Sequence, residues 1–287
     1  MDESESPARL RLVPPISRAR DFRLYTPDGR RLVDLWQYGG RAILGHTPPS
    51  VLREMKNTAE RGLFAPFPGP QERRFLKALS ALFPGRFFRV FPGDAALYRF
   101  LKDSGVSAAA ADPALPAAFP PRAAGFPADV PPGGPQPALW RPFLDGGDKP
   151  ASDCREAALP AESAAPFLIP VLPFPWAGAP RVLAFGAADT AVAASAGETL
   201  SPVILAAAAR AIYNLIAAQG QGRPLFQKIS RALSQNSPWK RRGAYLSLSV
   251  IPEGESYTAL FRRFLDAGYL LPPRPGEPAI LPGILSP

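Results

Sequence analysis

The sequence has very few of the residues that build metal and redox sites. Its 287 residues include one cysteine, one histidine and two methionines. The single Cys154 excludes an internal disulfide and any site with several cysteine ligands, and it suits a reducing cytoplasm. Because Cys154 and His46 lie in different segments, the sequence supports neither a Cys–His pair nor a Ser–His–Asp triad. We expect no metal site.

Long apolar runs are also missing. The longest uncharged stretch, residues 163–180, is interrupted by five prolines, so it is too short and too broken for a membrane helix. The first residues, MDESESPARL, are acidic and contain no apolar segment of a secretory signal. These absences predict a soluble, cytoplasmic protein with no membrane partner.

Positive charge is abundant but scattered. The formal net charge is +9, with 27 arginines and only six lysines among the 33 basic residues. The basic clusters are short, and aromatic residues do not alternate with them as they do on RNA-binding surfaces. A solvated arginine-rich surface explains the charge better than a nucleic-acid interface, which we keep as an alternative function.

The middle of the chain differs from its ends. Seventeen of the 38 prolines fall between residues 111 and 180, and residues 107–150 predict a long Pro/Ala-rich irregular connection. Elsewhere strands and helices alternate, which indicates an α/β architecture. Residues 21–35 predict a hairpin around Asp28–Gly29, and Ser50 predicts a helix N-cap. Further helices are expected near residues 71–83, 95–102, 202–218, 228–233 and 257–267, and strands near 86–91, 167–172, 181–185, 244–251 and 269–271.

Four stretches, in order along the chain, resemble the class III pyridoxal-phosphate (PLP) aminotransferases. The first, DLWQYGGRAILGHTPPSV, is most similar to the glutamate-1-semialdehyde aminomutase branch. Its matching positions are Asp34, Gly40, Gly45, His46 and Pro49. The others are QERRFLKALSALFPGRFFRVFPGDAALYRFLK, AGETLSPVILAAAARAIYNLI and FRRFLDAGYLLPPRPGEPAILPGILS.

The resemblance implies a shortened PLP-transferase of fold type I, in the α/β class. A reduced large domain with a mostly parallel sheet would span residues 61–224. A small α+β domain would combine residues 1–60 with residues 225–287. The resemblance also implies pyridoxal phosphate as cofactor and a site at a dimer interface.

The Schiff-base lysine that this chemistry needs has no matching position. Between Asp94 and Thr199 the only lysines are Lys102 and Lys149. Lys102 ends the helix after Asp94, where the family often has a basic surface residue. Lys149 lies far upstream of the family's lysine position, so it is the one weak candidate for a displaced catalytic lysine.

The acid that pairs with the pyridine nitrogen is missing too. The family places this aspartate at the end of a buried strand, and the nearest equivalent strand here, RVLAFGAADT, has Gly186–Ala187 at that point. Asp189 comes three residues late. Because no lysine matches the Schiff-base position, we expect any bound PLP to be held without a covalent bond.

The phosphate cup is altered at the residues that would touch the phosphate. The family's Ser-Gly-Ser/Thr-Glu-Ala corresponds to Pro92-Gly93-Asp94-Ala95-Ala96. Pro92 removes a hydroxyl and a backbone donor, and the Asp94 carboxylate would repel a phosphate carrying about two negative charges. Because aspartate is a favourable N-cap, we expect Asp94 to cap the helix in place of the ligand. Gly93, Asp94 and Ala95 thus mark a degenerate cofactor site.

Three other positions are carried over from the family pattern. Thr199 corresponds to a phosphate-binding threonine, although Glu198 is inserted beside it. Trp36 and Tyr38 lie in the loop that often lines the substrate pocket, and a role as core aromatics competes with that interpretation. His46 is expected to be structural.

The prediction from these residues is a non-catalytic binding or structural protein, a homodimer or a heterodimer with an intact homologue. An active aminotransferase or aminomutase that uses Lys149 is the alternative enzyme. A product that does not fold stably is a further interpretation, because the Pro/Ala-rich middle leaves little sequence for the large sheet.

Overall fold

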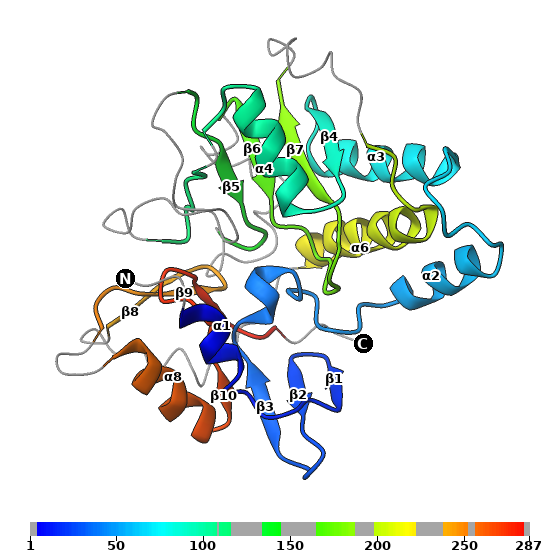
Figure 1. The fold of residues 1–287 in the computed structure, drawn as a ribbon. Helices are drawn as coiled ribbons and strands as arrows, with labels where there is room; N and C mark the ends of the chain where they lie inside the picture. Colours follow the sequence, from blue (N-terminus) through cyan, green and yellow to red (C-terminus); the bar gives the residue numbers. More distant parts are fainter. Residues whose placement is uncertain are drawn as a thin grey trace.

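The computed structural model describes seven stretches of the chain (Figure 1). They are residues 5–107, 109–115, 134–144, 165–186, 198–221, 238–251 and 256–283. The helices are α1 (Glu5–Leu10), α2 (Val51–Ala59), α3 (Pro70–Leu82), α4 (Asp94–Asp103), α6 (Pro202–Gln221) and α8 (Tyr257–Asp266), with a 3-10 turn at Gln37–Gly40. The strands are β1 (Arg18–Arg20), β2 (Arg23–Tyr25), β3 (Arg31–Asp34), β4 (Phe87–Phe91), β5 (Ala138–Trp140), β6 (Phe167–Pro170), β7 (Arg181–Phe185), β8 (Trp239–Arg242), β9 (Tyr245–Leu248), β10 (Tyr269–Leu270) and β11 (Ala279–Ile280).

A mixed four-stranded sheet forms the centre, with strand order β4-β7-β6-β5. Strands β5 and β6 are parallel, whereas β7 is antiparallel to both β6 and β4. The chain passes from β6 to β7 through residues 171–180 without a crossover helix, and this favours antiparallel pairing. As a result, the carboxyl ends of β4, β5 and β6 and the start of β7 lie at one edge of the sheet.

The central sheet is covered on both faces. On one face Val182 and Trp140 pack into an apolar core with helices α3 and α6. On the other face Leu183 and Leu139 pack against α4. Neighbouring residues of one strand therefore enter different cores, as the alternation of side chains along a strand requires.

Both ends of the chain meet in the rest of the structure. Strand β10 pairs in parallel with β3 at the edge of the sheet β1-β2-β3-β10, and these blue and orange strands lie side by side in Figure 1. Strands β11, β9 and β8 form a third sheet. Helix α8 closes this part, with Leu260, Phe261 and Leu265 buried against strand residues such as Leu32 and Leu246.

The α/β class and most of the expected elements are confirmed. Helix α3 buries Phe75 and Leu79 as its spacing predicts, and the hairpin turns at Gly29 with φ of 85°. Within the described residues the central sheet is mixed rather than mostly parallel, because β7 reverses direction.

Two details of the sequence interpretation were wrong, and one strand was not predicted. Residues 107–150 are not wholly irregular, since they contain β5. Strand β8 (Trp239–Arg242) lies where no element was expected. Ser50 occupies the N-cap of α2 but its side chain does not cap the helix; its hydroxyl accepts instead from Arg53 (3.2 Å). The helix expected at 228–233 lies outside the described residues, and the domain boundaries stay a prediction.

One described helix, α6, is long and apolar enough to cross a membrane. Its window Pro202–Gln219 has a mean hydropathy of 1.3, and half of it is buried inside the fold. Its alanines, among them Ala207 and Ala211, are fully buried in the core that α6 shares with α3. The apolar character of α6 is thus accounted for by packing within the protein.

Candidate functional site

A cavity of about 320 Å³ lies at the edge of the central sheet where β4, β5 and β6 end and β7 begins. This edge is where open α/β sheets place their ligands. The walls come from segments far apart in the sequence. They are Leu10, Trp36, Tyr38, Gly39, Arg41, Asp94, Leu139, Arg141, Ile169, Val171, Arg181, Pro273, Arg274 and Glu277.

The carboxylate of Asp94 is held between two arginines in this cavity. Arg41 Nη2 donates to Asp94 Oδ2 at 3.1 Å, and Arg181 Nε donates to Asp94 Oδ1. The arginine side chains are 14% and 12% exposed, and that of Asp94 is 35% exposed. Asp94 is therefore the anion that both guanidinium groups share.

Asp94 does not cap helix α4, which corrects the expectation from the sequence. The N-cap is Gly93, with no side-chain hydrogen bond, and Asp94 is the first helical residue. Charge-assisted hydrogen bonds to arginine are stronger than those to a neutral backbone donor, so the carboxylate turns to the guanidinium groups. At this first turn the carboxylate still interacts favourably with the helix dipole.

Arg181 lies in an environment that disfavours its charge. Burial, reinforced by the neighbouring charge of Arg41, lowers the pKa of Arg181 to about 10, although Asp94 acts in the opposite direction. The negative charge of Asp94 is thus shared by two positively charged guanidinium groups.

The walls of the cavity carry a second carboxylate, that of Glu277. Glu277 accepts a hydrogen bond from Trp36 Nε1 (3.1 Å) and lies 3.8 Å from Arg274 Nη1. Burial raises the pKa of Glu277, and the charges of Arg274 and Arg141 only partly offset this. Trp36 packs edge-on against Tyr38, with ring centroids 5.5 Å apart.

The loop that carries Trp36 and Tyr38 has an unusual backbone. Gln37, Tyr38, Gly39 and Gly40 all have positive φ, between 48° and 99°. Left-handed backbone costs a residue with a side chain about 1–2 kcal/mol, so the surroundings must hold Gln37 and Tyr38 in place.

The buried Asp34 carboxylate anchors this loop. Its Oδ1 accepts from the backbone N–H groups of Trp36 (2.9 Å) and Gln37 (2.8 Å). Its Oδ2 lies 2.8 Å from Nε2 of His46. The expectation of a structural role for His46 agrees with this contact, which joins the two ends of the motif.

Several of the other predicted residues do not line the cavity. Thr199 and Ala95 are exposed and do not line it, and Lys102 is exposed near the end of α4. Gly186 follows β7 at the opposite edge of the sheet, because β7 is antiparallel. Lys149, Ala187 and Asp189 lie outside the described residues.

Among the charged residues of the cavity, reasoning from the sequence missed Arg141, Arg181, Arg274 and Glu277. Arg41 stood inside the quoted motif but was given no role. The excess of arginine over lysine was the signal for the arginines, but these residues are scattered along the chain and form no contiguous cluster.

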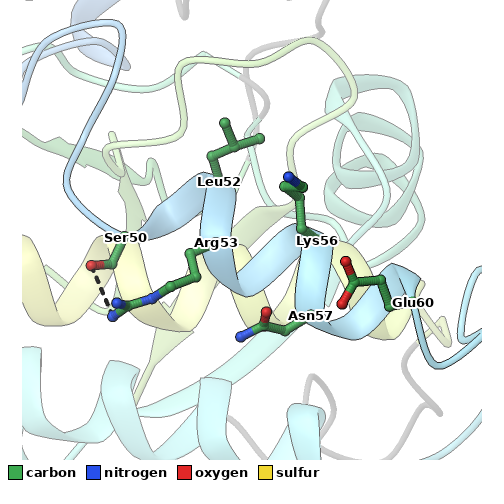
Figure 2. Close-up of a pocket in the computed structure, with 6 residues that line it drawn as sticks. All are labelled: Ser50, Leu52, Arg53, Lys56, Asn57 and Glu60. Atoms are coloured by element: carbon green, nitrogen blue, oxygen red, sulfur yellow. Dashed lines mark hydrogen bonds between the residues drawn. The ribbon is translucent and has the colours of Figure 1, made fainter.

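A second hollow, of about 480 Å³, lies on the outer side of α2 (Figure 2). It is lined by Ser50, Leu52, Arg53, Lys56, Asn57 and Glu60. These side chains belong to one helix and the residues that flank it, and the one interaction drawn in Figure 2 joins Arg53 to Ser50. All of its lining residues come from α2 and its ends, and almost all of them are exposed. The hollow is therefore an open surface depression and not an enclosed ligand site.

The fold of the described residues is shared with solved aminotransferases. Ornithine δ-aminotransferase of Plasmodium falciparum superimposes with a TM-score of 0.62 at 13% identity, over 94% of this chain and 88% of that one. Glutamate-1-semialdehyde aminomutase of Pseudomonas aeruginosa gives 0.57 at 16% identity, over 93% and 83%. The fold is that of the fold type I aminotransferases. No family model matches the chain.

Sequence comparisons give one long match and several short ones. An uncharacterized protein of Treponema pallidum is 27% identical over an alignment of 316 positions, gaps included, which covers 93% of this chain and 88% of that protein. A protein of Borreliella burgdorferi is 38% identical over 71 residues, 25% of this chain and 26% of its own length. The glutamate-1-semialdehyde 2,1-aminomutase of Sorangium cellulosum is 36% identical over 69 residues, 24% of this chain and 16% of the enzyme. The last two matches thus span about a quarter or less of those proteins.

The described residues of this aminotransferase fold do not fit a covalently bound pyridoxal phosphate. A carboxylate, Asp94, stands at the start of α4, where the cup of the family would receive the phosphate. The guanidinium groups beside it are already paired with that carboxylate. None of the described residues that line the cavity is a lysine.

Proposed function

We propose that this protein is an aminotransferase-fold protein without transaminase or aminomutase activity, which acts by binding rather than by catalysis. The observation that carries the proposal is the position of Asp94, whose carboxylate bonds to Arg41 and Arg181 at the start of α4. A phosphate, which carries about two negative charges, would meet the Asp94 carboxylate at this point, and that carboxylate already offsets part of the positive charge of the two arginines. At 4 Å two unit charges repel by about 1 kcal/mol in water and by about 4 kcal/mol near a protein surface.

The missing lysine supports the same proposal. Schiff-base chemistry requires an amine within bonding distance of the cofactor aldehyde, and the described cavity walls supply arginine instead. Arginine stays protonated and cannot replace that amine. Lys149, which lies outside the described residues, is the lysine that would form a Schiff base if the protein were active after all.

The experiment treats the purified full-length chain with pyridoxal phosphate, records its visible spectrum, reduces it with borohydride and measures its mass. We expect no absorption band shifted from that of the free cofactor and no specific adduct. The Pseudomonas aeruginosa aminomutase serves as the positive control, and Lys149→Arg as the matched variant. A stoichiometric adduct that disappears in Lys149→Arg would overturn the proposal.

We further propose that the protein is a cytoplasmic dimer, of two copies or of one copy with an intact homologue. The support is the shared fold and the sequence resemblance, which imply a site at a dimer interface. Light scattering during size-exclusion chromatography, with and without the homologue, measures the mass. A monomer under both conditions would contradict this part of the proposal.

A further inference from the structure

Arg41 and Arg181 have donors that the protein does not use. A guanidinium group has five N–H donors. Within the described part of the chain, each of these arginines makes one hydrogen bond, to Asp94, and Arg41 also lies over the Tyr38 ring at 5.0 Å. Because both side chains are mostly buried and both line the cavity, their remaining donors are available to a ligand inside it.

The charges around the cavity do not cancel. Arg141 is balanced by Asp112, with which it forms a close ion pair. That leaves Arg41, Arg181 and Arg274 against two carboxylates, Asp94 and Glu277. The described walls therefore carry one positive charge in excess, which a single negative charge would neutralise.

The rest of the cavity is apolar. Leu139 of β5, Ile169 of β6, Val171 just after β6 and Trp36 all line it. A volume of about 320 Å³ is at the small end of the range for ligand sites. Such walls suit a compact apolar or aromatic body rather than a sugar or a nucleotide.

We propose that the cavity binds a small organic monoanion, with its carboxylate on Arg41 and Arg181 and its apolar body against Trp36, Ile169 and Val171. The carboxylate takes the guanidinium donors that Asp94 leaves free, so the ligand lies beside Asp94. This inference rests on the proposed function, because a pyridoxal phosphate in the same cavity would exclude the ligand.

The probe is benzoate, and its binding to the full-length protein is measured by calorimetry. Benzamide has the same shape without the negative charge, so it tests whether binding depends on the charge of the carboxylate. Charge-assisted hydrogen bonds contribute about 1.5–3 kcal/mol, so we expect benzamide to bind about tenfold or more weakly than benzoate. Arg181→Gln is expected to weaken benzoate binding by about tenfold or more. The matched control, Arg53→Gln on the exposed side of α2, should leave it unchanged.

A second variant keeps the test informative if Arg181→Gln does not fold. Asp94→Asn removes the competing carboxylate and keeps the shape of the side chain, so benzoate should bind more tightly. Inorganic phosphate should bind the native protein more weakly than benzoate does, since phosphate has no apolar body and its second negative charge faces Asp94. Circular dichroism checks that each variant is folded.

The inference is overturned if benzoate does not bind the folded native protein, if benzamide binds equally well, or if Arg53→Gln weakens binding as much as Arg181→Gln. Tighter binding of phosphate than of benzoate would also overturn it, in favour of a phosphate site. The benzoate measurements do not depend on whether the protein forms a covalent adduct with pyridoxal phosphate. If it forms no adduct and binds no benzoate, the proposed function stands and only the proposed ligand is wrong.

Discussion

Arg141 and Asp112 form a two-point ion pair in the interior of the protein. Nε of Arg141 lies 2.8 Å from Oδ1 of Asp112, and Nη2 lies 2.6 Å from Oδ2. The same guanidinium donates to the Gly39 carbonyl (3.2 Å) and lies 5.4 Å from the centre of the Tyr245 ring. One side chain thus joins the end of β5, the loop beside the cavity and strand β9.

We expect Asp112→Asn to destabilise the fold strongly. Arg141 is 2% exposed, so the variant would leave a buried charge without its partner, at a cost of about 3–5 kcal/mol. Urea unfolding measures the loss. Asp21→Asn is the control, because the pair of Asp21 with Arg20 is exposed on both sides and contributes about 0–1 kcal/mol. Equal losses in the free energy of unfolding in the two variants would show that the fold tolerates buried Arg141 without the Asp112 carboxylate.

Asp34 is expected to determine the shape of the loop that carries Trp36. Asp34→Ala removes the acceptor for two backbone N–H groups and for His46, so we expect a loss of roughly 3 kcal/mol in the free energy of unfolding. His46→Ala removes only one of these contacts and should cost about 1 kcal/mol. Hydrogen exchange at the amides of Trp36 and Gln37 should be faster in Asp34→Ala alone. Equal exchange in the two variants would contradict this role.

The neighbouring glycines of that loop should respond differently to alanine. Both have positive φ, but a Cβ at Gly39 meets nothing within 4 Å. A Cβ at Gly40 comes within 3.2 Å of Val171 and 3.3 Å of Arg141. Gly39→Ala should cost only the left-handed conformation, about 1–2 kcal/mol, and Gly40→Ala should cost more and displace the buried guanidinium. Thermal unfolding of the pair tests this, and equal losses would count against it.

Local patterns predicted the elements that depend on local interactions. The spacing of Phe75 and Leu79 indicated one face of α3, and the Asp28–Gly29 pair indicated the hairpin, because turn geometry and helix period are properties of a few successive residues. Strand β5 was missed since its three residues lie in a proline-rich stretch and are too few to show a period. The order of the four family-like stretches predicted the fold correctly.

The cavity could not be predicted in the same way. Arg41, Arg141 and Arg181 come from three separate segments, and no local rule says that isolated arginines will meet. The expectation for Asp94 failed for a related reason. An aspartate at a helix start usually caps the backbone, but two guanidinium groups from distant segments offer stronger, charged donors.

The pH dependence of stability should report on Glu277. Burial raises the pKa of Glu277 in the folded protein above the ordinary glutamate value, so the folded chain takes up this proton at a higher pH than the unfolded chain does. Between those two pKa values the folded state binds more protons, and the free energy of unfolding falls as the pH rises. The contribution is fully present below the unfolded pKa and is lost as the pH rises through the folded pKa.

Glu277→Gln removes that titration and keeps an oxygen to accept from Trp36 Nε1. We therefore expect the stability of Glu277→Gln relative to the native protein to increase from pH 4.5 to pH 7. Glu54→Gln is the control, because Glu54 pairs with the exposed Arg74 at the surface (3.2 Å), and its relative stability should not increase over that range. Denaturant unfolding at several pH values supplies both differences. A relative stability of Glu277→Gln that stays constant or decreases toward pH 7 would mean that Glu277 enters the folded state as readily charged as neutral. The described walls of the cavity would then carry the one excess positive charge that is counted for them with Glu277 ionised.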